Sequence, residues 1–335
     1  MKNFILCFSF LTLSFLLPQT LLASEDLSSF DPLPVMTFPA DNLYSVEKEM
    51  LGKMLFFDPR LSGSNWIRCA TCHDPALGFS DALPRSIGDG QKELGRHSPT
   101  VINTGYNLSQ FWDGRAKTLE EQALGPIQAA GEMNQNIDNL IKELNAIPEY
   151  RRLFKKIFPE EGVSASTIGK ALATFERTII SANSPFDRYL AGNKTAMSRS
   201  AINGMNLFAG KAGCNLCHNG PNFTDNKFHN IGVEPGGPLQ KDSGRFAVTK
   251  EVDDTGAFKT PTLRHITRTA PYMHNGTEKT LSDVVEFYNL GGKSKENLSP
   301  LIQPLSLTEK EKDELVEFLK ALEGEPIAVS IPILP

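Results

Sequence analysis

The sequence contains one five-residue pattern twice, as Cys69-Ala-Thr-Cys72-His73 and again as Cys214-Asn-Leu-Cys217-His218. Cys-x-x-Cys-His is the pattern of covalent c-type haem attachment. Two thiols one helical turn apart can each add to a vinyl group of one haem, and the following histidine is then held beneath the iron as its proximal ligand. The sequence therefore predicts two covalently bound haem c groups, with His73 and His218 as the iron ligands.

Two other uses of these four cysteines compete with haem attachment. A Cys₄ zinc site or a pair of disulfides would need the same cysteines. Neither use requires a histidine directly after each cysteine pair, so haem attachment is favoured.

The first 23 residues have the layout of a secretory signal. Lys2 precedes an apolar run over residues 4–17, and Pro18 and a stretch that ends in Ala23-Ser24 follow it. A retained membrane anchor is the alternative, but the run is shorter than the roughly 20 residues that a spanning helix needs. We therefore expect residues 1–23 to be removed together with Cys7, the mature chain to have no membrane span, and the protein to be periplasmic.

The composition is that of an ordinary soluble protein. Hydrophobic residues make up 40% of the 335 residues, charged residues make up 22%, and the formal net charge is −5. These values exclude a disordered, collagen-like or coiled-coil chain. The absence of a long basic cluster argues against nucleic acid as a partner. The length is sufficient for two domains, each with its own core.

Apolar residues at three- and four-residue spacing predict helices along much of the chain. The patterns lie at residues 137–144, 150–158, 164–181 and 308–322, and a further helix from Thr118 should be interrupted at Gly125-Pro126. Thr118 and Thr308 each begin a capping box, whereas period-two strand patterns are scarce. We expect an all-α fold of two cytochrome c-like domains, at residues 24–183 and 184–335, each with one haem. Residues 181–185 are the expected linker.

Further blocks of sequence resemble the bacterial di-haem cytochrome c peroxidases and the related MauG-like enzymes. The blocks lie at residues 51–62 (LGKMLFFDPRLS), 111–115 (FWDGR), 119–133, 261–264 (PTLR) and 269–276 (TAPYMHNG). They occur in this order around the two haem motifs, so the resemblance extends through most of the mature chain. It implies that the N-terminal haem is the peroxide site and that the C-terminal haem is the site of electron entry.

The resemblance also implies roles for three residues of the peroxide domain. Glu132 matches a distal residue that moves a proton between the two oxygens of hydrogen peroxide, which is general acid–base catalysis. Gln122 matches a residue that positions the peroxide by hydrogen bonding. Trp112 matches an aromatic residue between the two haems that could carry charge. Without the haem motifs, Gln122 and Glu132 would be interpreted as polar residues on an exposed helix and Trp112 as a core residue.

Two positions differ from the better-known peroxidases. Many of those enzymes have a histidine that blocks the resting peroxide haem, and this chain has Asp89 at that position, in a glycine-flanked turn. We therefore expect the first haem to be open without reductive activation, with His97 as the nearest later histidine on the same loop. At the second haem, Tyr288 stands where the peroxidases have a distal methionine, as in MauG-like enzymes. Met273 is the rival ligand.

The resemblance further implies a calcium ion between the haems. Thr269 and Pro271 match residues whose backbone carbonyls bind this ion. The side-chain contributor in that pattern is an asparagine, and His97 stands in its place, whereas calcium prefers oxygen ligands. Calcium therefore stays an open alternative. His274 matches a family position near the second haem that is expected to tune it.

The leading hypothesis is a di-haem peroxidase that reduces hydrogen peroxide to water with electrons from a small redox protein, such as a cytochrome c or a cupredoxin. A MauG-like enzyme that oxidises residues of a partner protein is the first alternative. A plain electron-transfer di-haem cytochrome is the alternative from a different class. Its two six-coordinate haems would leave Glu132 without a role.

The two motifs generate a direct test of cofactor attachment. We expect mass spectrometry of the mature chain to show the added mass of two covalent haems, and expect both to be missing when the chain is exported without c-type maturation. A mature chain that carries fewer than two attached haems would contradict the assignment of the motifs.

Overall fold

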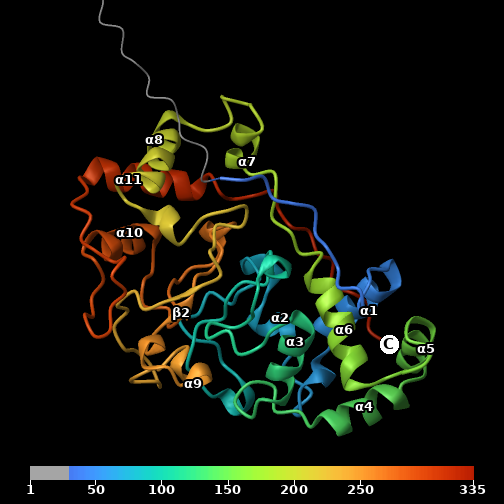
Figure 1. Cartoon of the computed structure of the whole chain (residues 1–335). Helices are drawn as coiled ribbons and strands as arrows, with labels where there is room; N and C mark the ends of the chain where they lie inside the picture. The colour runs from blue at the N-terminus through green and yellow to red at the C-terminus, as the bar shows by residue number, and fades with distance from the viewer. Residues whose placement is uncertain (1–29) are drawn as a thin grey trace, which may run out of the picture.

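The structure is a computed structural model that describes residues 30–335, so the expected signal segment and Cys7 lie outside the described residues. The described α-helices are α1 (Val46–Phe56), α2 (Cys69–Cys72), α3 (Leu119–Gln128), α4 (Ile137–Ala146), α5 (Pro148–Ile157), α6 (Ala165–Glu176), α7 (Pro185–Leu190), α8 (Arg199–Ala209), α9 (Phe246–Thr249), α10 (Leu281–Asn289) and α11 (Glu309–Lys320). One antiparallel pair joins β1 (Phe228–His229) to β2 (Phe258–Lys259). The predicted all-α class is confirmed (Figure 1).

Side chains at the helix starts explain where several helices begin. Thr118 and Thr308 precede α3 and α11, and each hydroxyl accepts a hydrogen bond from the backbone N–H three residues further on, at 3.1 and 3.3 Å. Such caps satisfy backbone donors that have no partner within the first helical turn. Both helix starts were predicted from the sequence.

Two helix ends differ from the expectation. The helix α3 is not interrupted at Gly125-Pro126 but continues to Gln128, because Pro126 removes only one backbone donor and Ala129 N still bonds to Gly125 O at 3.0 Å. The helix expected over residues 164–181 ends earlier, as α6. The backbone of Ser181 is held instead by the side chain of Asn103, which accepts from Ser181 N at 2.9 Å.

The hydrophobic side chains form two separate cores. One lies among α1, α3, α4, α5 and α6, and the other among α7, α8, α10 and α11. Figure 1 shows these two groups of helices at opposite ends of the molecule, with the loops and the small sheet between them.

Each core contains one very close helix crossing. Gly52 of α1 lies against Ala171 of α6, and Gly204 of α8 lies against Glu314 of α11. A Cβ atom at these glycines would lie 1.9 Å from the carbonyl oxygen of Ala171 and 1.8 Å from that of Glu314. Only a residue without a Cβ permits such an approach. Both cores therefore depend on a glycine at the point where two helices cross.

The two terminal segments cross between the cores. Phe30 packs in the second core. Ile327 and Val329 pack against the first core, and Lys53 Nζ of α1 donates to Ser330 Oγ at 2.9 Å. Figure 1 accordingly shows the C-terminus beside α1 and α5. The domain boundary between residues 183 and 184 stays a prediction. The two terminal segments do not follow it, because each packs on the core of the other half.

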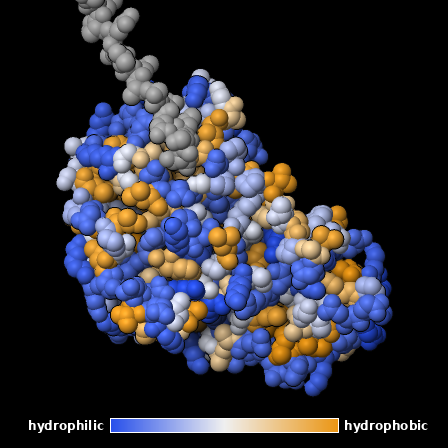
Figure 2. All heavy atoms as spheres, in the orientation of Figure 1, coloured by the Kyte–Doolittle hydropathy of each residue, from blue (hydrophilic) through white to orange (hydrophobic). Residues whose placement is uncertain are grey.

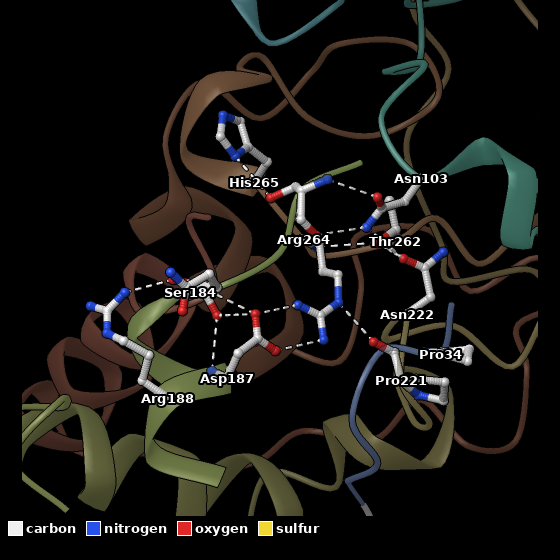
Figure 3. Close-up of polar contacts among 12 residues, drawn as sticks. Pro34, Asn103, Ser184, Asp187, Arg188, Pro221, Asn222, Thr262, Arg264 and His265 are labelled. Carbon is white, nitrogen blue, oxygen red and sulfur yellow. Dashed lines mark hydrogen bonds and ion pairs between the residues drawn. The ribbon is translucent and has the colours of Figure 1, made fainter. Parts of the chain in front are cut away.

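A buried polar network connects the two halves (Figure 3). The Arg264 side chain is fully buried and donates to both carboxylate oxygens of Asp187, each at 2.9 Å, and to Pro221 O at 2.7 Å. Nearby, Asn103 of the first half donates to Asn222 Oδ1 of the second half at 3.2 Å. Because a buried charge is tolerated only with good partners, this bidentate pair fixes the local geometry.

No helix between residues 30 and 335 has the length and apolar character needed to cross a bilayer. On the face in Figure 2, apolar residues are scattered among hydrophilic ones rather than joined into one continuous patch.

The close crossings lead to a stability prediction. We expect Gly52→Ala and Gly204→Ala each to lower the free energy of unfolding by about 1–3 kcal/mol, because the added methyl group forces the helices apart. Thermal unfolding followed by circular dichroism would measure this. The matched control is Gly131→Ala, whose Cβ would meet only Leu94, at 3.7 Å. Equal melting temperatures for all three variants would contradict the prediction.

Candidate functional site

The first Cys-x-x-Cys-His motif forms a single helical turn that ends at its histidine. Cys69 and Cys72 begin and end α2, and His73 N donates to Cys69 O at 3.0 Å. The His73 ring places Nδ1 3.2 Å from Phe79 O. A backbone carbonyl only accepts hydrogen bonds, so the ring proton lies on Nδ1 and the lone pair lies on Nε2. This is the state in which an imidazole ligates iron.

The second motif repeats this arrangement. Cys214 lies at the start of a 3-10 turn, and His218 N donates to Cys214 O at 2.8 Å. The Nδ1 atom of His218 lies 2.9 Å from Phe223 O. Burial lowers the pKa of both motif histidines and so favours the neutral imidazole. The four cysteines form no disulfide with one another. The donor sets therefore fit two haems.

A large cavity surrounds the second motif. Cys214, Cys217 and His218 line it, and both candidate sixth ligands, Tyr288 of α10 and Met273, line it as well. Burial and the nearby Cys214 and Cys217 raise the pKa of Tyr288 above its ordinary value. Because both side chains reach the same cavity, the structure does not separate the two ligands, and Tyr288 stays a prediction.

Trp112 also lines this cavity and joins the two halves of the molecule. Its indole Nε1 donates to His97 O at 2.9 Å, and its carbonyl accepts from Lys259 N of β2 at 2.8 Å. The next residue, Asp113, is buried and accepts from Arg96 at 2.7 Å. These bonds fix Trp112 from both sides, which suits the role between the haems that the sequence predicts.

The two predicted distal residues lie in and just after α3. Gln122 is in the helix, and Glu132 follows it in a turn in which its N–H donates to Ala129 O at 2.9 Å. Both side chains are half-buried, and neither makes a side-chain hydrogen bond within the described part of the chain. Burial raises the pKa of Glu132, while Arg115 acts in the opposite direction.

The charge of Glu132 affects a cysteine of the first haem motif. Burial is the main reason that the pKa of Cys72 is raised to about 11, and the charges of Asp81 and Glu132 add to this effect. The candidate proton carrier thus acts through its charge on one of the two cysteines that would hold the first haem.

Asp89 has a structural role that the sequence interpretation missed. Its backbone N–H donates to Glu132 O at 2.8 Å, and its carboxylate accepts from Asn134 at 2.9 Å. Gly88, just before it, packs so closely on Gly131 that a Cβ would lie 1.9 Å from the carbonyl oxygen. The loop with Asp89 therefore supports the segment that carries Glu132. A close backbone approach of this kind has no local sequence signal.

His97 does not fit the role of a calcium ligand. It lines the same cavity as Thr269 and Pro271, but its Nδ1 lies 2.8 Å from Leu83 O and its Nε2 lies 3.4 Å from Ser80 Oγ. The ring is buried, offers no oxygen, and has both nitrogens directed at protein groups, whereas calcium requires oxygen ligands. We assign no step to calcium.

His274 is packed between charged and aromatic groups near the second motif. Its ring stacks on Phe258 with centroids 3.6 Å apart, and Arg96 lies over the same phenylalanine at 5.4 Å. Burial lowers the pKa of His274 to about 4, so the ring is neutral near pH 7. The expected tuning of the second haem by His274 stays a prediction.

Comparisons with known proteins agree with this geometry. The model of the di-haem cytochrome c peroxidase family matches residues 46–195. Methylamine utilization protein MauG of Methylorubrum extorquens is 44% identical over 298 residues, which cover 89% of this chain and 84% of that protein. Cytochrome c551 peroxidase of Nitrosomonas europaea is 39% identical over 303 residues, which cover 90% and 87%.

A solved structure gives the same result for the fold. The crystal structure of a MauG-like protein associated with microbial copper homeostasis superposes with a TM-score of 0.80 at 33% sequence identity. The match covers 90% of this chain and 95% of that chain. The similarity thus includes most of the chain.

The position of Glu132 leads to a prediction about activity and pH. We expect Glu132→Gln to lower peroxide turnover by roughly 10²–10⁴-fold while both haems stay bound, since the change removes a proton carrier and no iron ligand. The raised pKa implies that wild-type turnover falls on acidification at a higher pH than for an ordinary glutamate, because the protonated carboxyl cannot accept the proton of peroxide.

Steady-state rates between pH 4 and pH 8 would measure both effects. Glu160→Gln, at an exposed position, is the matched control. Near-normal turnover of Glu132→Gln, or an unchanged acid limb in that variant, would count against the assignment.

Proposed function

The chain belongs to the di-haem cytochrome c peroxidase family, which includes MauG-like proteins, and we propose that it reduces hydrogen peroxide to water with electrons from a small redox protein. As a member of this family it is an oxidoreductase that acts on peroxide and carries two haems. The observation that carries the proposal is the half-buried Glu132, which is held in a turn after α3 by backbone bonds to Ala129 and Asp89 and whose carboxylate makes no hydrogen bond in the described residues.

Both haems are proposed to be covalently attached, through Cys69 and Cys72 and through Cys214 and Cys217. The two motif turns and the free Nε2 of each motif histidine support this attachment. Haem c attachment also suits export, and with the N-terminal signal pattern it supports a periplasmic location.

At the first haem, the chain supplies proton transfer and substrate orientation. When bound, this haem supplies the iron at which the O–O bond of peroxide is reduced. Glu132 takes the proton from one peroxide oxygen and returns it to the other as water leaves. The Gln122 amide orients the peroxide by hydrogen bonding. Half-buried side chains without other hydrogen bonds are suited to both tasks.

At the second haem, we propose Tyr288 as the sixth ligand and Trp112 as the residue that carries charge to the first site. The tyrosine hydroxyl has no hydrogen bond to another side chain in the described residues, and Trp112 is fixed between both halves. A small cytochrome c or a cupredoxin is the proposed electron donor.

The second candidate function is MauG-like oxidation of residues in a partner protein. It is supported by the 44% identity to MauG of Methylorubrum extorquens and by Tyr288, which occupies the position of the distal ligand in such enzymes. A plain electron-transfer cytochrome fits less well, because it gives no role to Glu132.

Donor turnover would separate these functions. With the peroxidase function, peroxide oxidises two reduced one-electron donors per molecule consumed, and the haem protein is needed for the reaction. If no small cytochrome c or cupredoxin is oxidised at a useful rate, while a partner protein gains oxidised side chains, the MauG-like function replaces it.

The position of Asp89 leads to a prediction about activation. We expect the fully oxidised protein to react with stoichiometric peroxide at once, because Asp89 is bonded to Asn134 and offers no nitrogen or sulfur ligand to the first iron. Stopped-flow absorption spectroscopy would detect this. Asp89→His should slow the reaction until an electron is supplied, whereas Asp89→Asn should not. If the wild-type protein needs an electron and His97→Ala does not, His97 blocks the first haem and the expectation is wrong.

A further inference from the structure

Lys259 is a buried lysine that the mechanism above does not use. It is the second residue of β2, lies opposite Phe228 of β1, and is only 8% exposed. Its backbone N–H donates to Trp112 O at 2.8 Å. Lys259 also lines the cavity around the second haem motif, together with Cys217 and His218.

The ammonium group of Lys259 has no anionic partner in the described chain. Asp225 is the acid whose charge acts on Lys259, but its two oxygens accept from His229 Nε2 and from Lys227 N, both at 2.9 Å. Among residues 30–335, no carboxylate oxygen lies within 4.0 Å of Lys259 Nζ. Burial lowers the pKa of Lys259 to about 8, with Asp225 acting weakly in the opposite direction.

An ammonium group without an anionic partner is costly on a side chain that is as largely buried as that of Lys259. Removal of such a charge from water costs several kcal/mol unless an anion and good hydrogen bonds offset the loss. The cavity that Lys259 lines is built to hold a haem, and the haem carries two propionate carboxylates. A propionate is therefore the anion whose chemistry matches this ammonium group.

We propose that the Lys259 ammonium pairs with a propionate of the second haem and so holds that haem against the Trp112 segment. One residue then contacts both partners, since its side chain binds the haem and its main chain bonds to Trp112 O. Lys259 is a positioning residue in this arrangement. The proposal rests on the two haems shown by family membership and is independent of which protein donates electrons.

The test compares three variants of the mature di-haem protein. Lys259→Met removes the charge and keeps the length of the side chain, and Lys259→Arg keeps the charge. Lys227→Met removes a charge at an exposed position, where the lysine is still close enough to lower the pKa of Cys217. Spectroelectrochemical titration gives the reduction potential of the second haem, and resonance Raman spectroscopy gives its propionate bending band.

We expect Lys259→Met to shift the potential of the second haem downwards and to move the propionate band, because loss of a nearby positive charge favours the oxidised iron. Lys259→Arg should retain wild-type values. Lys227→Met should shift the potential by less than Lys259→Met, because the Lys227 charge is exposed and screened by solvent, and should leave the propionate band unchanged. Loss of the second haem from Lys259→Met but not from Lys259→Arg would also support the pairing.

The proposal is overturned if Lys259→Met and Lys227→Met give the same potential and the same propionate band. It is also overturned if Lys259→Met and Lys259→Arg both lose the haem, since the role of the residue is then one of packing. Neither result bears on whether peroxide is reduced at the first haem, because both readouts report on the second haem alone.

Discussion

Both haem sites depend on the same interaction, a hydrogen bond between a motif histidine and the carbonyl of a buried phenylalanine. Phe79 O faces His73, Phe223 O faces His218, and each phenylalanine belongs to a different core. Both phenylalanines have positive φ, of 56° and 52°, which turns the carbonyl towards the ring. The packing of each core thus determines which imidazole nitrogen is available to iron.

The region between the two halves is held by charged groups rather than by apolar packing alone. Arg96 bonds to Asp113, beside Trp112, and to Asp242 of the second half, at 2.7 Å in both cases. Arg245 of the second half donates to Asp113 O at 2.9 Å. Such a connected set of partly buried bonds resists small displacements of one half relative to the other.

Local patterns in the sequence predicted the features that depend on neighbouring residues. The two motifs and the caps at Thr118 and Thr308 involve contacts within a few residues, which is why spacing alone revealed them. The close approach of Gly52 to Ala171, the support of Glu132 by Asp89, and the partnerless ammonium of Lys259 each join segments far apart in the chain. A single sequence does not show which distant segments pack together. The expectation that Pro126 interrupts the helix was also wrong, since α3 continues to Gln128.

The crossing of the terminal segments also affects the order in which the molecule can be assembled. A chain is synthesised from its N-terminus, yet the first core is completed by Ile327 and Val329, which follow Leu322 of the second core in the sequence. The cysteines of the first motif are therefore available long before their own core can close. With the covalent attachment proposed above, this interval gives the haem access to Cys69 and Cys72 before the late segment closes the core.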